Sequence, residues 1–114
     1  MRKHWADEAV TQLERGQSVR VQPKGHSMSG RINEGDVVWL EPCCAEDLFI
    51  GDIVLAHIKG QRYAHWVLHL ILDYNESEFL VGSNNGRIDG WVAAASILGK
   101  FVRIETSQTV NSPS

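Results

Sequence analysis

The spacing of hydrophobic positions near the start of the chain is that of a helix. Trp5, Ala9 and Leu13 recur every four residues, and Gly16 follows them as a stop signal. Apolar residues at this interval fall on one face of an α-helix, and a glycine just beyond the last of them is a common helix end. The pattern therefore predicts a short amphipathic helix over residues 4–15.

From Ser18 onward the pattern changes to short runs of branched and aromatic residues, each bounded by Gly, Pro, Asp or Asn. Such runs are typical of strands, and the polar residues between consecutive runs are typical of hairpin turns. The predicted strands contain Val19 and Val21, then residues 37–40, 53–56, 62–72, 78–81 and 99–104, with hairpin turns at 59–61 and 73–76.

These elements indicate one domain, since 114 residues bury a single core and are too few for two. We expect an N-terminal helical segment over 1–17, a β domain over 18–105 and a flexible tail over 106–114. The predicted fold class is mostly β, built of short strands and hairpins with one short N-terminal helix. Residues 82–86, Gly-Ser-Asn-Asn-Gly, form a run that tolerates positive φ.

Composition narrows the classes of partner. The net charge is −3, from 11 basic and 14 acidic residues, and the basic residues form no block that would favour phosphates, so we expect no nucleic-acid partner. No stretch approaches the roughly 20 apolar residues that cross a bilayer. Asp7 and Glu8 stand where a secretion signal needs its apolar centre. We therefore expect no membrane partner and a cytoplasmic location.

The two cysteines, Cys43 and Cys44, are adjacent, and a disulfide between neighbours would be strained. We expect reduced thiols. The spacings among these cysteines and the five histidines match no metal-ligand signature. The sequence therefore predicts no bound metal and no cofactor.

The segment with the clearest chemical signal is Gly25-His26-Ser27-Met28-Ser29-Gly30, which presents a serine between glycines. A serine hydroxyl is a weak nucleophile until a base accepts its proton. The function of Ser27 therefore depends on a basic partner from elsewhere in the chain, and the alternative is a serine that only caps a turn.

Several ordered segments together resemble the LexA-like and signal-peptidase-like serine peptidase superfamily. The resemblance covers roughly residues 18–104 and includes Gly25-His26-Ser27-Met28, Gly35-Asp36-Val37-Val38, Gly51-Asp52-Ile53-Val54 and Asn84-Asn85 before Ile88-Asp89-Gly90. It implies a mostly β fold in which the serine lies at a turn whose backbone N–H groups help to form an oxyanion pocket.

The resemblance also implies site residues. Ser27 takes the position of the nucleophile, and the lysine base of some branches is absent from the strand that begins at Arg62. The branch with a histidine base places His65 as general base and Asp89 as its orienting acid. An imidazole, whose ordinary pKa is about 6.5, accepts a seryl proton near neutral pH without strong desolvation. His69, four residues on and on the same strand face, is the alternative base.

We therefore expect a small serine endopeptidase that acts on a peptide or protein substrate. Gly25, His26, Met28 and Trp66 are the predicted substrate-binding residues, and the substrate would add to the sheet as an extended strand. The alternative is a catalytically inactive module on the same fold that binds a peptide or forms a homodimer. It is motivated by departures from the family pattern, namely the missing lysine, Gly30 in place of proline, and Ser83 in place of an aspartate.

Overall fold

The computed structural model describes residues 5–24, 28–59 and 64–105, and in them seven strands form one antiparallel sheet. The strand order is β1-β2-β7-β3-β4-β5-β6, and a single α-helix precedes the strands. The elements are α1 (Asp7–Glu14), β1 (Val19–Val21), β2 (Val37–Pro42), β3 (Ile53–Lys59), β4 (Ala64–Tyr74), β5 (Glu78–Gly82), β6 (Ile88–Ala93) and β7 (Ile97–Glu105), with short 3₁₀ turns η1 (Ala45–Asp47) and η2 (Ala94–Ser96).

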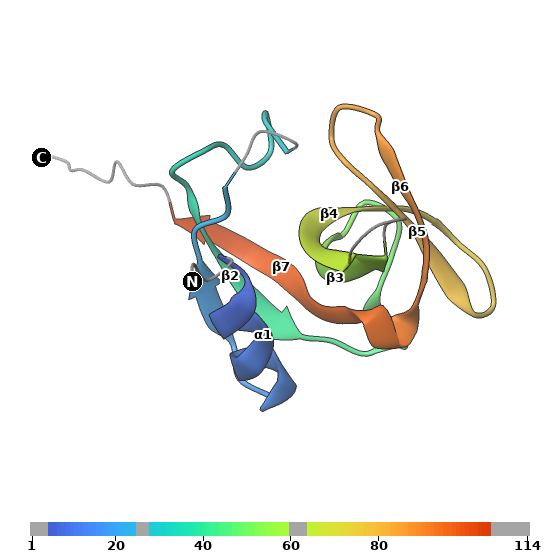
Figure 1. Cartoon of the computed structure of the whole chain (residues 1–114), viewed down its shortest axis with the longest axis horizontal. Coiled ribbons are helices and arrows are strands. Elements are labelled where there is room, and N and C mark those ends of the chain that lie inside the picture. Colours follow the sequence, from blue (N-terminus) through green and yellow to red (C-terminus); the bar gives the residue numbers. More distant parts are fainter. Residues whose placement is uncertain (1–4, 25–27, 60–63, 106–114) are drawn as a thin grey trace, which may run out of the picture.

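The C-terminal strand β7 joins the two sides of the sheet. It runs diagonally between the β1–β2 pair on the left of Figure 1 and the hairpins of β3–β6 on the right. Gly99 of β7 lies opposite Leu55 of β3 and next to Leu13 of α1, where a Cβ atom would be 2.8 Å from a Leu13 methyl. A glycine at this position therefore lets the helix approach the sheet closely.

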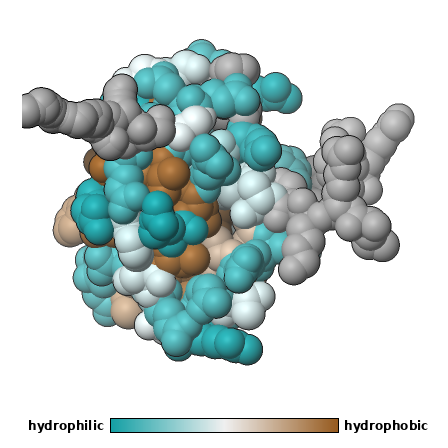
Figure 2. Space-filling model, turned by 90° about the vertical axis from the view of Figure 1, so that its left-hand side faces the viewer, coloured by the Kyte–Doolittle hydropathy of each residue, from teal (hydrophilic) through white to brown (hydrophobic). Residues whose placement is uncertain are grey.

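Side chains alternate between two cores because successive residues of a strand point to opposite faces. Leu55 belongs to the cluster that lies against α1 together with Leu13, whereas its neighbour Val54 belongs to the second cluster with Ile71. The helix covers the first cluster, and Figure 2 shows an apolar area among hydrophilic side chains on the left-hand side of the molecule as drawn in Figure 1. The surface on this side is therefore not uniformly polar.

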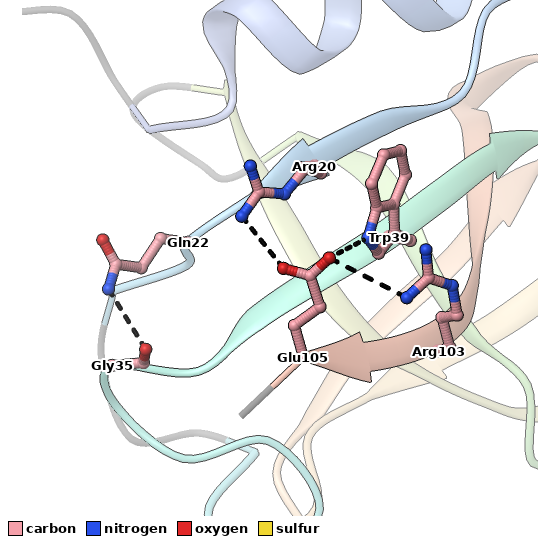
Figure 3. Close-up of polar contacts among 6 residues, drawn as sticks. All are labelled: Arg20, Gln22, Gly35, Trp39, Arg103 and Glu105. Carbon is pink, nitrogen blue, oxygen red and sulfur yellow. Dashed lines mark hydrogen bonds and ion pairs between the residues drawn. The ribbon is translucent and has the colours of Figure 1, made fainter. Parts of the chain in front are cut away.

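A polar cluster at the end of β7 fixes the outer strands (Figure 3). Glu105 accepts hydrogen bonds from Trp39 Nε1 at 2.7 Å and from Arg20 at 2.9 Å, and it lies 3.8 Å from Arg103. The guanidinium groups of Arg20 and Arg103 also stand over the Trp39 ring. The hydrogen bond from Trp39 and the two arginines lower the pKa of Glu105.

The mostly β prediction with one N-terminal helix is confirmed. Strand β6, which contains Asp89 and Gly90, was not predicted from the sequence, and neither were the two 3₁₀ turns. In the run 82–86, Gly86 has a positive φ, of +93°. The turn at 59–61 and the tail at 106–114 fall wholly or partly outside the described residues. No helix in the described residues is long and apolar enough to span a membrane.

Candidate active site

A cavity of about 620 Å³ lies beside β4, and its lining also includes the first two residues of β6. Its lining combines two imidazoles and one carboxylate with apolar side chains, among them His65, His69, Asp89, Met28 and Trp66. A concave site with a few convergent polar groups on an apolar lining is the usual form of a ligand or substrate site. This cavity is therefore the candidate active site.

His69 and Asp89 are in direct contact within this cavity. His69 Nδ1 lies 2.5 Å from Asp89 Oδ2, and the two side chains are only 10% and 11% exposed. A carboxylate at Nδ1 fixes the ring orientation and favours the proton on that nitrogen. Nε2 is then the ring nitrogen that is suited to accept a proton from a nucleophile, as in a Ser-His-Asp triad.

Strand register explains why His69, and not His65, meets Asp89. Leu70 of β4 lies opposite Gly82 of β5, which lies opposite Ile88 of β6. His69 and Asp89 each stand one residue from this row, and both line the cavity. His65 is four residues further along β4, a distance of about 13 Å in an extended strand.

A buried serine holds the turn that leads into β6. Ser83 is 3% exposed, its amide donates to the Arg87 carbonyl at 2.8 Å, and its hydroxyl accepts from the Arg87 amide at 3.2 Å. The same hydroxyl donates to the side-chain oxygen of Asn85. Ser83 therefore has a bracing role, because it sets the path of the chain toward Asp89.

The segment that follows Ser27 is attached to this turn by Asn84. Asn84 Nδ2 donates to the Ser29 carbonyl at 2.8 Å, and Asn84 Oδ1 accepts from Arg31 Nε at 2.8 Å. Within the segment, the Met28 carbonyl accepts from the amides of Arg31 and Ile32 at 2.9 and 2.8 Å. The serine segment and the turn before Asp89, which are far apart in sequence, are therefore connected by side-chain hydrogen bonds.

Gly30 lies in this segment with φ of +97°. Proline, whose φ is fixed near −65°, could not adopt this backbone. The Gly30 amide donates to Asn33 Oδ1 at 3.0 Å, a hydrogen bond that proline could not form. The turn here is therefore built differently from one that contains proline.

The structure brings together several of the residues selected from the sequence. Met28, His65, Trp66 and Asp89 all line the cavity, and the Trp66 ring also packs on His57 at 4.8 Å between centroids. Gly25, His26 and Ser27 lie outside the described residues.

Asp89 contacts His69, which the sequence offered as the alternative base to His65. The catalytic roles of Ser27, His65, His69 and Asp89 stay predictions. The sequence analysis missed the bridging roles of Asn84 and Arg31. Asn84 was part of the motif, but nothing in the sequence pointed to the segment that it would hold.

The two cysteines differ in environment, although both are unbridged. Cys44 is exposed, whereas Cys43 is half-buried and packs against the second core cluster. Burial, with smaller effects from nearby charges, raises the pKa of Cys43 to about 11. Among the described residues, no group of three or more His, Cys, Asp or Glu side chains is arranged to hold a metal ion.

This difference predicts unequal reactivity toward a thiol reagent. At about pH 8 only about one Cys43 thiol in a thousand is ionised, and the thiolate is the reactive form. A chromogenic disulfide should therefore modify Cys44 rapidly and Cys43 slowly, which rapid-mixing absorbance measures. The Cys43→Ser variant should keep the fast phase and Cys44→Ser should lose it; equal rates in the two variants would contradict the assignment.

Comparisons of the chain with protein-family models, with curated proteins and with solved structures found no match. The function is therefore inferred from the residues of the cavity, their geometry and the resemblance of the sequence.

Proposed function

We propose that the protein is a serine-peptidase-like hydrolase in which Ser27 attacks a peptide carbonyl and His69, oriented by Asp89, accepts the seryl proton. The observation that carries the proposal is the His69–Asp89 contact in a cavity that Met28, the residue after Ser27, also lines. Nucleophilic acyl transfer by a serine needs a nearby histidine that accepts the seryl proton, and a buried carboxylate that holds the histidine ring.

The chemistry follows from the two ring nitrogens of His69. As the Ser27 oxygen bonds to the substrate carbonyl carbon, its proton passes to Nε2, and the Asp89 carboxylate at Nδ1 stabilises the imidazolium that forms. The imidazolium then protonates the leaving amine, which completes the cleavage of the peptide bond and leaves an acyl-serine. Water, deprotonated by the same nitrogen, releases the acid and regenerates the serine.

The proposal assigns the base to His69 in preference to His65. Both imidazoles line the cavity and stand on the same face of β4, but it is His69 that contacts Asp89. A general base needs a group that fixes its ring, because a misoriented imidazole presents the wrong nitrogen. His65 then lines the substrate path.

Strand β4 provides a route for a peptide substrate. It pairs with β3 from Ala64 to Leu70, and its pairing with β5 begins only at Leu70. No strand of the described residues lies beside residues 65–69 on the side opposite β3. An extended peptide bound along this edge would gain main-chain hydrogen bonds, with Trp66 beside it.

Labelling by a fluorophosphonate tests the hydrolase proposal, because this reagent forms a stable bond only with an activated serine. Mass spectrometry of the digested protein should locate the adduct on Ser27, and Ser27→Ala should lose it. Ser29→Ala is the matched control, since Ser29 is a nearby serine whose carbonyl, not its hydroxyl, contacts Asn84. Absence of any adduct on the wild-type protein, or an adduct that persists in Ser27→Ala, would contradict the proposal.

A catalytically inactive peptide-binding module is the second candidate, and the edge of β4 that has no strand partner among the described residues favours it. It predicts that peptides bind and no fluorophosphonate adduct forms. The labelling experiment therefore separates the two functions.

A further inference from the structure

Three basic side chains surround the cavity. Lys24, Lys59 and Arg87, here called the rim cations, belong to its lining and are exposed to solvent. Among the described residues of the lining, Asp89 is the one acidic residue, and its carboxylate is already in contact with His69. The cavity is therefore positively charged, although the whole chain carries a net charge of −3.

The rim cations are not neutralised by the protein itself. Across residues 5–24, 28–59 and 64–105, none of them takes part in an ion pair. Other cations of the sheet are engaged, since Arg20 and Arg103 contact Glu105, and Lys100 lies 3.4 Å from Asp52. The positive charge at the cavity is thus available to a ligand.

Much of the remaining lining is apolar and includes Met28, Ile58, Trp66 and Val67, with the polar side chains of Asn33, Ser83 and Asn85 among them. A ligand that fits this cavity therefore carries an apolar group, which contacts the apolar side chains of the lining, and negative charges, which lie near the rim cations. The adjoining edge of β4 offers backbone groups to an extended chain, which favours a peptide over a nucleic acid.

We propose that the cavity binds an extended peptide segment in which acidic side chains flank an apolar residue. This inference rests on the proposed function in one respect, namely that such a segment would be the substrate of Ser27. Complementary charge at a rim increases the rate of encounter and selects among partners more than it increases affinity. The selectivity should therefore be moderate and sensitive to salt.

Binding can be measured without cleavage in the full-length Ser27→Ala variant. The probes are fluorescent peptides of about ten residues, the upper length of an ordinary strand. They share an apolar centre and differ only in flanks of glutamate, glutamine or lysine. Fluorescence anisotropy should show the glutamate peptide binding about tenfold more tightly than the glutamine peptide at low salt, because each exposed ion pair contributes little and three act together. The preference for the glutamate peptide should disappear near 1 M salt, because the Debye length is then only about 3 Å.

Charge reversal of the rim cations supplies the decisive comparison. The triple variant Lys24→Glu, Lys59→Glu, Arg87→Glu should lose the glutamate preference and favour the lysine peptide. Arg15→Glu is the matched control, since Arg15 is an exposed cation outside the lining and should leave the preference unchanged. Circular dichroism of both variants establishes that the sheet is intact.

Each outcome separates this inference from the hydrolase proposal. Equal affinity for the three peptides, or an unchanged preference in the triple variant, would overturn the acidic-peptide site even if Ser27 is labelled. A glutamate preference without labelling would support the site and contradict the hydrolase. A single-stranded oligonucleotide that binds as tightly as the glutamate peptide would also overturn the inference, because it would show attraction to any polyanion.

Discussion

Replacement of His69 by alanine should lower the rate at which a fluorophosphonate modifies Ser27 by about 10²–10⁴-fold, the usual contribution of a general base. Without this imidazole no group oriented by Asp89 accepts the seryl proton. Asp89→Asn should also lower the rate strongly, because an amide at Nδ1 favours the wrong tautomer and does not stabilise the imidazolium. The rate is measured by intact-protein mass spectrometry over time.

His65→Ala is the matched control for this prediction. His65 lies on the same strand face and lines the same cavity, so its loss removes a comparable imidazole without touching the His69–Asp89 contact. We expect the labelling rate of His65→Ala to stay within about tenfold of the wild-type rate, as for a residue that only lines the path of the reagent. If His65→Ala loses labelling and His69→Ala retains it, the base is His65 and the assignment made here is wrong.

Replacement of Leu55 by alanine should lower the free energy of unfolding by about 2–5 kcal/mol, as for other large-to-small changes in closed cores. Leu55 is 0% exposed on β3, opposite Leu68 of β4 and Gly99 of β7. The lost methyl groups leave a cavity that the surrounding strands cannot readily close, because β3 is paired on both sides. Urea denaturation followed by tryptophan fluorescence measures the change.

Val102→Ala provides the surface comparison for Leu55→Ala. Val102 is 46% exposed on β7, so truncation removes little buried area, and we expect a loss of at most about 0.5 kcal/mol. Similar losses for the two variants would show that the core around Leu55 is not packed as described.

Some strands could be predicted from the sequence, because a short continuous run of apolar residues bounded by turn residues is typical of a strand that is buried on both faces. The runs around Val54 and Leu68 are of this kind, and they became β3 and β4. Strand β6 could not be predicted in this way. It contains Asp89 and Gly90, residues typical of turns, and Gly90 has a φ of +134° beside an irregularity in the β5–β6 register.

The sequence pointed to Met28, His65, Trp66 and Asp89, which line the cavity, but it did not show which histidine contacts Asp89. His65 and His69 are equivalent by period, since both stand on one face of β4. Which of them meets Asp89 depends on the row of Leu70, Gly82 and Ile88, and that row follows from hairpin lengths and register irregularities that no local pattern specifies. The bridge through Asn84 was unpredictable for the same reason, because it joins segments 55 residues apart.

The most direct measurement is a crystal structure of the protein after reaction with the fluorophosphonate. We expect an adduct on Ser27, with the His69 Nε2 atom within about 2.6–3.2 Å of the serine oxygen and Asp89 in contact with His69 Nδ1. An adduct whose serine oxygen faces His65, or a Ser27 side chain on the opposite side of the sheet from His69, would contradict this expectation.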